Sequence, residues 1–526
     1  MIYTLSQLLS ETAARYPEKD AVVFQDQTVS YRALDKLSNQ VAQSLKKQGV
    51  SPGDRVGIYI NKSIPSVISI FGILKADAVY VPLDPWAPAK RLGYIIKNCD
   101  IKCLLTGSDK MNFVARMIDA ESPLECVILT DSGQYSTELP RVATIDWSEV
   151  QGEADDTPAR KSIETDLAYI LYTSGSTGDP KGVMISHLNA FTFINWAYET
   201  VKMQPEDRVA NHAPHHFDLS IFDIFVTVKA GGTLYPVPTH TAKFPVKLAE
   251  FICENKISVW YSVPSAWVHM LTHGKMDAHD FSALRTIIFA GEVFPIKHLQ
   301  RLIQRIPGAD YYNWYGPTET NVITSFKVEN LDPNSNTPVS IGKACENMGI
   351  FILDENGRAV TQTGVTGELY GRGAGVAQGY WNDPGKTARL FVQNPLQSHF
   401  NDRTYRTGDL VQIGEDGNLT YLGRRDHQVK VQGYRIELGE IENALLNHPQ
   451  IKEAAVVAVK DEQQATYLKT FLTLNDADAT LSILDIKRHC SRFVPRYMIP
   501  ESVEFCDHLP KTSTGKIDKK SLAEVR

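Results

Sequence analysis

The chain has 526 residues, of which 43% are hydrophobic and 22% charged, so it must bury a large apolar core and is not mainly disordered. Its 54 basic and 61 acidic residues give a formal charge of −7, which offers no sequence-wide basis for binding nucleic acid or an anionic membrane. No apolar run approaches the roughly 20 residues that span a bilayer, and the N-terminus lacks the features of a signal peptide. Seven cysteines without a CxxC pair favour reduced thiols and a cytoplasmic protein.

The first hundred residues alternate between strand-like and helix-like segments. The expected elements are, in order, strands at 21–24 and 28–31, a helix from Leu34 to Leu45, a strand at 55–60, a helix at 66–75 and a strand at 79–83. The same order returns later, with strands at 259–263 and 286–289 that each precede a helix. This βαβ pattern predicts an α/β fold in which helices cover the faces of parallel sheets.

The character of the sequence changes after residue 349. Short strands with turn signals predict a β-rich subdomain at about 349–422. A small αβ pattern follows, with helices at 440–447 and 484–493 and strands at 454–459 and 467–474. We therefore expect an N-terminal lobe of residues 1–425 and a C-terminal lobe of residues 426–526.

The segment LYTSGSTGDPKGV, at 171–183, lies between two β-type runs. Glycines let backbone N–H groups approach an anion, while hydroxyls and an ammonium add donors and charge. The segment therefore predicts a phosphate-binding loop, although it lacks the GK[ST] ending of a P-loop. Its candidate contacts are Thr173, Ser174, Gly175, Ser176, Thr177, Gly178 and Lys181.

This loop resembles the phosphate-binding signature of the adenylate-forming superfamily, which includes acyl-CoA synthetases, luciferases and the adenylation domains of nonribosomal peptide synthetases. Other motifs of that family follow in order: NWYGPTE at 313–319, GELYGRGAGVAQGY at 367–380, YRTGDL at 405–410, GRRDHQVKVQGYRIELGEIE at 423–442 and TGKID at 514–518. The resemblance covers essentially the whole chain and implies a large N-terminal lobe with a small, mobile α+β C-terminal lobe. One departure is Asp77, where the family usually has glycine.

The resemblance implies ATP and Mg²⁺ as cofactors, and a substrate carboxylate that attacks the α-phosphate of ATP. An anion must then approach a polyanion, so catalysis requires positioning and electrostatic stabilisation. The implied roles are Lys181 on the β,γ-phosphates, Thr318 on phosphate, Glu319 on Mg²⁺, Asp409 on the ribose hydroxyls, Arg424 near ribose and phosphates, Lys516 between carboxylate and α-phosphate, and Asp426 as the hinge of the small lobe. The nucleotide site would also include Asn313, Tyr315, Gly316 and Tyr421.

The segment FDLSIFDIF, at 217–225, bears on the substrate class. Asp218 matches the aspartate with which amino-acid-activating members bind the substrate α-ammonium. A carboxylate within an apolar run is also costly to bury unless it meets a cation. The other pocket positions implied by the resemblance are Leu219, Phe222, Ser262, Ile288, Ala290, Gly291, Trp314, Val322 and Ile323. None is charged, and the bulk of Phe222 and Trp314 predicts a shallow pocket for alanine, 2-aminobutyrate, proline or glycine.

The main hypothesis is a ligase that forms an aminoacyl-AMP and transfers the aminoacyl group to the phosphopantetheine thiol of a carrier protein acting in trans. A D-alanine–carrier protein ligase is an alternative, and an acyl- or aryl-CoA ligase is another, which Asp218 disfavours. A binding module without activity is disfavoured because the residues assigned to catalysis are all present. The resemblance is also compatible with a small activating partner protein.

Overall fold

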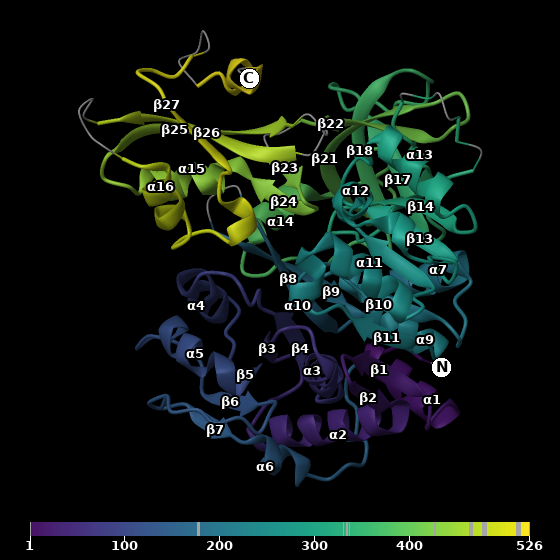
Figure 1. The fold of residues 1–526 in the computed structure, drawn as a ribbon, viewed down its shortest axis with the longest axis vertical. Helices are drawn as coiled ribbons and strands as arrows, with labels where there is room; N and C mark the ends of the chain where they lie inside the picture. Colours follow the sequence, from purple (N-terminus) through teal and green to yellow (C-terminus); the bar gives the residue numbers. More distant parts are fainter. Residues whose placement is uncertain are drawn as a thin grey trace.

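The computed structural model describes residues 2–175, 179–329, 331–332, 335, 337–425, 428–461, 466–475, 481–511 and 517–524. The chain forms a large lobe that contains three sheets and a smaller lobe near the C-terminus (Figure 1). In Figure 1 the small lobe, in yellow and yellow-green, lies beside the sheet of β17, β18 and β21 and over helix α4. This arrangement confirms the fold class expected from the sequence.

One large sheet has the strand order β19-β9-β8-β4-β3-β5-β6-β7. Its strands are β3 (Arg55–Tyr59), β4 (Val79–Pro82), β5 (Cys103–Thr106), β6 (Cys126–Leu129), β7 (Ala143–Ile145), β8 (Leu167–Thr173), β9 (Lys181–Ser186) and β19 (Gly379–Tyr380). Strands β8, β4, β3, β5, β6 and β7 are joined in parallel, and β9 and β19 are added antiparallel. The associated helices are α3 (Ile64–Lys75), α4 (Ala89–Asn98), α5 (Met111–Met117) and α6 (Trp147–Gln151). The predicted parallel sheet is therefore confirmed.

The second large sheet has the order β16-β15-β14-β13-β12-β10-β11-β1-β2. Its strands are β1 (Asp20–Phe24), β2 (Gln27–Ser30), β10 (Arg208–Asn211), β11 (Thr233–Pro236), β12 (Val259–Ser262), β13 (Thr286–Ala290), β14 (Asp310–Tyr315), β15 (Thr324–Lys327) and β16 (Lys343–Ala344). Strands from β1 through β14 in this order run parallel, and the flanking strands are antiparallel. The associated helices are α1 (Leu5–Arg15), α2 (Tyr31–Lys47), α7 (His187–Val201), α8 (Leu219–Ile221), α9 (Thr227–Ala230), α10 (Thr239–Lys243), α11 (Pro245–Glu254), α12 (Pro264–His273) and α13 (Ile296–Arg305).

The main core lies between these two sheets. It joins apolar residues from both, such as Ile58 of β3 and Val209 of β10, with Phe71 of the buried helix α3. Helix α3 begins where the sequence dictates, because the Ser63 hydroxyl accepts from the Ser66 N–H and a proline occupies the first turn. Burial on all sides explains why α3 is apolar around its whole circumference.

The β-rich subdomain and the small lobe complete the chain. The subdomain contains β17 (Met348–Leu353), β18 (Thr366–Gly373), α14 (Pro384–Leu390), β20 (Phe391–Gln393), β21 (Arg403–Ile413) and β22 (Leu419–Arg424). The small lobe contains the hairpin β23 (Gln428–Val431) and β24 (Tyr434–Glu437), followed by α15 (Leu438–Leu446), β25 (Ile451–Lys460), β26 (Thr466–Leu474), α16 (Ile483–Cys490), β27 (Ser502–Phe505) and α17 (Lys519–Glu524). The small lobe has its own apolar core, built around Ile441, Val456 and Leu472.

Two local details refine the expectations from sequence. Helix α16 ends at Cys490 rather than at Phe493, because the N–H groups of Arg492 and Phe493 donate to carbonyls three residues back, in a turn tighter than the α-helix. Asp77 has a left-handed backbone with φ of +62°, which explains why glycine is the usual residue at this position. Its carboxylate accepts hydrogen bonds from the backbone N–H groups of Lys161 and Ser162. In the described part of the chain, no helix is both long and apolar enough to cross a bilayer.

Candidate active site

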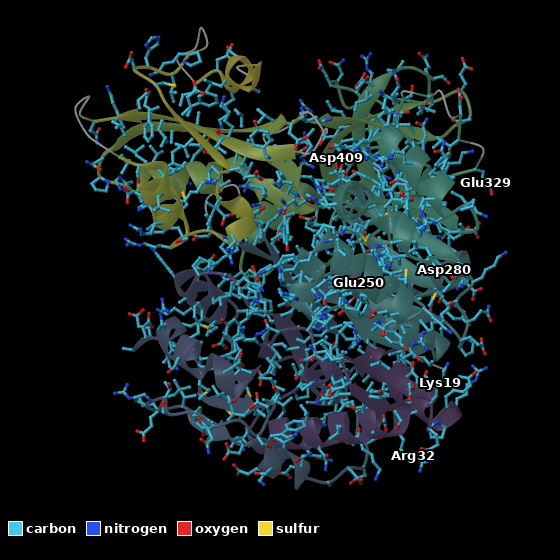
Figure 2. All side chains as sticks on the ribbon, in the orientation of Figure 1. Lys19, Arg32, Glu250, Asp280, Glu329 and Asp409 are labelled. Atoms are coloured by element: carbon cyan, nitrogen blue, oxygen red, sulfur yellow. The ribbon has the colours of Figure 1, made fainter. Side chains whose placement is uncertain are left out.

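A cavity lies where the hairpin β23–β24 of the small lobe meets the large lobe. It is lined by Phe217, Asp218, Leu219, Tyr261, Ala290, Gly291, Gly316, Pro317, Thr318, Asn321, Val322, Asp409, Arg424, Lys430, Gly433 and Arg435. Figure 2 places Asp409 at this junction, on the side of the large lobe. The folding of the chain thus brings together cavity residues that lie more than 200 positions apart in the sequence, such as Phe217 and Arg435.

The loop that the sequence predicts to bind phosphate, called the phosphate-binding loop below, connects strands β8 and β9. Thr173 ends β8 and is the register partner of Lys181, which begins β9, so the sheet fixes both ends of the loop. A Cβ at Gly175 would lie 2.0 Å from the Asp179 carbonyl oxygen, so only glycine fits there. Among the described residues, the buried Thr173 Oγ1 has no hydrogen-bond partner and is available to a ligand. Ser176, Thr177 and Gly178 lie outside the described residues.

Lys181 and Glu319 form a buried ion pair in the large lobe. Lys181 Nζ donates to Glu319 Oε1 at 2.9 Å, and the Tyr380 hydroxyl donates to the same oxygen at 2.6 Å. Burial lowers the pKa of Lys181 to about 8, although the charge of Glu319 opposes the shift. Burial alone would raise the pKa of Glu319, but nearby cations hold it well below its ordinary value. Glu319 is therefore an ionised carboxylate next to the phosphate-binding loop.

Asp409 lies on β21 and is the register partner of Arg424 on β22. Arg424 Nη1 donates to Asp409 Oδ1 at 2.8 Å, and the Tyr315 hydroxyl donates to Oδ2. The Tyr421 ring lies 6.1 Å from that of Tyr315, centroid to centroid. These contacts hold the Asp409 carboxylate at the edge of the cavity, in a position suited to accept from hydroxyl groups.

Two other predicted nucleotide-site residues stabilise the backbone around this carboxylate. Asn313 does not line the cavity, because its side-chain amide donates to the Ser340 carbonyl at 2.8 Å. Gly316 does line it, and a Cβ there would lie 1.6 Å from the Asn321 carbonyl oxygen. The turn that carries Thr318 and Glu319 therefore requires glycine at this position.

Asp218 lies at the start of the short helix α8 and lines the cavity together with Thr318 and Lys430. Burial raises the pKa of the Asp218 carboxyl above its ordinary value, against the opposing effects of the Thr318 hydroxyl and the Lys430 ammonium. A bound ammonium group would add a compensating charge and thereby favour the ionised carboxylate. One corner of the cavity therefore presents a carboxylate that is suited to an ammonium group.

On strand β12 the structure corrects the predicted pocket residue. Ser262 does not line the cavity: its hydroxyl accepts from Trp260 Nε1 at 2.8 Å and donates to the Val263 carbonyl at 3.1 Å. The neighbouring Tyr261 lines the cavity instead. Successive side chains of a strand point to opposite faces, so an error of one position in the sequence comparison reverses the assignment.

Aromatic rings close the cavity behind Asp218. Phe222, Tyr261 and Trp314 contact one another, with ring centroids 5.3 to 5.6 Å apart. Ile288 is buried in the same core as these rings. Ile323 faces the other way and packs in the core of the β-rich subdomain with Tyr315. Of the predicted pocket residues, Leu219, Ala290, Gly291 and Val322 line the cavity directly, and Phe222 and Trp314 stand behind them.

Several cavity residues were not assigned from the sequence, above all Lys430, Gly433 and Arg435 on the small-lobe hairpin. Their signal was present in the motif GRRDHQVKVQGYRIELGEIE, but the motif alone does not show which side chains reach the large lobe. Tyr380 ends the motif at 367–380, but nothing in that motif indicates that its hydroxyl donates to Glu319. The predicted hinge Asp426 and the predicted catalytic Lys516 lie outside the described residues.

Comparison with known proteins gives a consistent result. Residues 9–381 match the family model of the AMP-binding enzyme, and residues 440–516 match that of the AMP-binding enzyme C-terminal domain. The chain is 38% identical to an L-proline–[L-prolyl-carrier protein] ligase of Pseudomonas fluorescens over 99% of this chain and 98% of the relative. A Streptomyces coelicolor protein of the same name is 35% identical, over 98% of this chain and 95% of the relative.

Among solved structures, that of IdnL1 superposes with a TM-score of 0.81 at 28% identity, covering 97% of this chain and 99% of IdnL1. The two family models together span most of the sequence and reach into both lobes, and the stretch between them carries the cavity residues Asp409, Arg424, Lys430, Gly433 and Arg435. The chain therefore belongs to the family of AMP-binding enzymes.

Proposed function

We propose that this protein uses ATP to activate a small neutral amino acid and then transfers the aminoacyl group to the phosphopantetheine thiol of a carrier protein. The observation that carries the proposal is the position of Asp218. Its half-buried carboxylate, suited to an ammonium, lines the same cavity as Asp409 and Arg424, which are suited to a nucleotide.

The relatives narrow the choice of substrate. Two of them are named as L-proline–carrier protein ligases. Tyr261 lines the cavity and packs against Phe222 and Trp314, so this side of the cavity is suited to an apolar side chain and offers it no charged partner. L-proline, whose ammonium and side chain form one small ring, is therefore the substrate that we propose.

In the first half-reaction, a carboxylate oxygen of the amino acid attacks the α-phosphorus of ATP. A new oxygen–phosphorus bond forms, the bond to the β-phosphate oxygen breaks, and pyrophosphate leaves with the electron pair. Asp218 would hold the ammonium and thereby orient the carboxylate, while Asp409 would accept from the ribose hydroxyls. Lys181 would place positive charge beside the β,γ-phosphates, so that the anionic carboxylate can approach.

In the second half-reaction, the carrier thiol attacks the carbonyl carbon of the aminoacyl-AMP. A carbon–sulfur bond forms, the carbon–oxygen bond to the phosphate breaks, and AMP leaves with the electron pair while the thiol loses its proton to solvent. Lys430 would keep a cation near the departing AMP, because it lines the cavity from the small lobe.

The residues present fit Mg²⁺ as a cofactor. The described residues contain no group of three or more His, Cys, Asp or Glu that could form an all-protein metal site. Mg²⁺ is commonly held by one or two carboxylates together with substrate phosphates, and the ionised Glu319 beside the phosphate-binding loop supplies such a carboxylate. When bound, the metal would neutralise phosphate charge.

By resemblance we also propose that Lys516 bridges the substrate carboxylate and the α-phosphate, and that Asp426 is the hinge of the small lobe. In single-turnover assays, Lys516→Ala should lose adenylation by roughly 10²–10³ and retain thioester formation from supplied aminoacyl-adenylate. Asp426→Pro should slow carrier loading more than pyrophosphate exchange, because proline fixes φ at the hinge. Equal loss of both steps in Lys516→Ala would contradict this assignment.

The central experiment is ATP–pyrophosphate exchange with a panel of acids: both enantiomers of proline and alanine, glycine, 2-aminobutyrate and cyclopentanecarboxylate, which has the ring of proline without the nitrogen. We expect exchange with L-proline and none with cyclopentanecarboxylate. Asp218→Ala should abolish exchange with L-proline. Exchange only with acids that lack an amino group would contradict the proposal, and exchange only with D-alanine would favour a D-alanine–carrier protein ligase.

A further inference from the structure

Arg435 reaches across the lobe junction to the carboxylate assigned to the metal. It lies on β24 of the small lobe, and its Nη1 donates to Glu319 Oε2 at 2.8 Å. The other oxygen of Glu319 accepts from Lys181 and Tyr380, both of the large lobe. The side chain of Glu319 is fully buried and that of Arg435 is 13% exposed, so solvent screens this ion pair little.

The charges around Glu319 show what Arg435 contributes. Burial opposes charge on Arg435, but the charge of Glu319 overcomes this effect and keeps the pKa of the guanidinium well above its ordinary value. The charge of Arg435 also helps to depress the pKa of Lys181. Arg435 therefore places a second positive charge next to the buried carboxylate of Glu319. The charge of Lys181 alone would already neutralise the negative charge of this carboxylate.

The backbone of the hairpin explains why Arg435 is at this place. The Ser174 hydroxyl, next to the phosphate-binding loop, donates to the Arg435 carbonyl. The Gly433 N–H donates to Glu292 Oε1 at 2.8 Å, and Glu292 Oε2 also accepts from the Ser265 N–H of the large lobe. A Cβ at Gly433 would lie 2.1 Å from Val263, so glycine is required for the hairpin to approach the large lobe this closely. The position of Arg435 thus depends on how the two lobes are arranged.

We propose that Arg435 substitutes for the metal at Glu319, so that metal binding and the observed lobe arrangement exclude each other. The guanidinium occupies Oε2, the oxygen of Glu319 that neither Lys181 nor Tyr380 uses, and like charges prevent a divalent cation from sharing it. Arg435 is a positioning residue in this role: it stabilises the observed arrangement once the metal has left. The inference rests on the proposed function of Glu319 as a metal ligand.

The coupling must act in both directions. If the metal displaces Arg435 from Glu319, the observed arrangement must weaken metal binding by the same factor by which the metal weakens that arrangement. Metal therefore favours withdrawal of the hairpin, and loss of the metal favours its return. This would order the reaction cycle, because departure of metal with pyrophosphate would allow the hairpin to dock.

Metal binding tests the competition directly. We would titrate the full-length protein, free of nucleotide, with Mn²⁺ and measure free Mn²⁺ by electron paramagnetic resonance. The dissociation constant should fall about tenfold in Arg435→Gln and stay near that of the wild type in Arg435→Lys, which keeps the charge. The double variant that carries both Arg435→Gln and Glu319→Gln should lose this increase in Mn²⁺ affinity. Arg372→Gln, which breaks a surface ion pair with Asp402 within the large lobe, is the matched control and should not alter binding.

The lobe arrangement provides a second readout. Dyes on cysteines introduced at Ile163 of the large lobe and Leu484 of the small lobe, both exposed, would report the distance between the lobes after Cys253 and Cys506 are replaced by serine. Mg²⁺ should change energy transfer in the wild type, whereas KCl at equal ionic strength should not. Arg435→Gln without metal should already show the value that the wild type reaches at saturating Mg²⁺.

Equal Mn²⁺ affinity in the wild type and Arg435→Gln, including undetectable binding in both, would overturn the inference. Equal energy transfer in these two proteins would also overturn it. Thermal unfolding of each variant would show whether it is still folded. If Arg435→Gln were unfolded, Arg435→Lys and Glu319→Gln would still be compared with the wild type in Mn²⁺ affinity and energy transfer. These measurements need no amino acid and no carrier protein. A negative result would therefore count against the competition between Arg435 and metal even if amino-acid-dependent exchange is observed, and a positive result could be obtained even if exchange is not observed.

Discussion

Arg91 of helix α4 and Glu440 of helix α15 form a buried ion pair that joins the two lobes. The Arg91 guanidinium donates to Glu440 Oε1, and the side chains are only 7% and 2% exposed. Burial raises the pKa of Glu440, and the charge of Arg91 opposes that shift. A pair so well shielded from water is expensive to break by removing one partner, at about 3–5 kcal/mol.

Because its partners lie on different lobes, this pair should stabilise only the arrangement in which they meet. We expect Glu440→Gln to slow aminoacyl transfer to the carrier about tenfold and to change ATP–pyrophosphate exchange less than twofold. Single-turnover measurement of the two half-reactions tests this. Glu504→Gln breaks the Lys469–Glu504 pair within the small lobe and should slow neither step. Equal slowing of both steps by Glu440→Gln would show that the pair merely maintains the fold.

The lowered pKa of Lys181 predicts how ATP use depends on pH. Burial brings this pKa to about 8, so the ammonium of the free enzyme loses its proton as the pH rises through that value. The phosphates of ATP need the charged form, so kcat/KM for ATP should fall about tenfold per pH unit above pH 8. In Lys181→Arg the guanidinium stays charged, and the fall should disappear even if the maximum is lower. The measurement is kcat/KM for ATP between pH 6.5 and 10 for both proteins. A fall of the same midpoint in Lys181→Arg would assign the titration to another group.

Tyr261 and Ser262 are adjacent, yet only Tyr261 lines the cavity, which makes them a matched pair for testing substrate selection. Tyr261→Leu removes part of the aromatic wall, so exchange with larger amino acids such as leucine and phenylalanine should rise relative to proline, by about 10- to 100-fold. Ser262→Ala should leave the ranking of amino acids unchanged, although it removes the acceptor for Trp260 Nε1. Exchange kinetics over the acid panel distinguish the two. A changed ranking in Ser262→Ala would support the original assignment from sequence.

The left-handed backbone of Asp77 leads to a prediction about stability. Asp77→Gly keeps the conformation and loses the bonds to the backbone of Lys161 and Ser162, whereas Asp77→Ala also suffers the strain of φ at +62°. Asp77→Ala should therefore be less stable than Asp77→Gly by about 1 kcal/mol. Urea unfolding followed by tryptophan fluorescence measures the difference. If the alanine variant were as stable as the glycine variant, backbone strain would not contribute.

Much of the fold could be read from the chain because the relevant signals are local. Alternating strands and helices, as at 55–83, produce a parallel sheet whenever the crossovers are short. The pattern of glycines and hydroxyls around Lys181 predicts an anion-binding loop, whereas the role of Glu319 is expected only from the resemblance of its motif to that of the family.

Tertiary structure decided which side chains share the cavity. The sequence determined that a strand runs through Tyr261 and Ser262, but which of the two faces the cavity depends on how that strand packs in its sheet. Likewise, the motif around Arg435 is plain in the sequence, while its ion pair with Glu319 exists only because the hairpin docks against the large lobe. Local backbone preferences act through neighbouring residues and leave a pattern, whereas a contact across 116 positions follows from the packing of the two lobes.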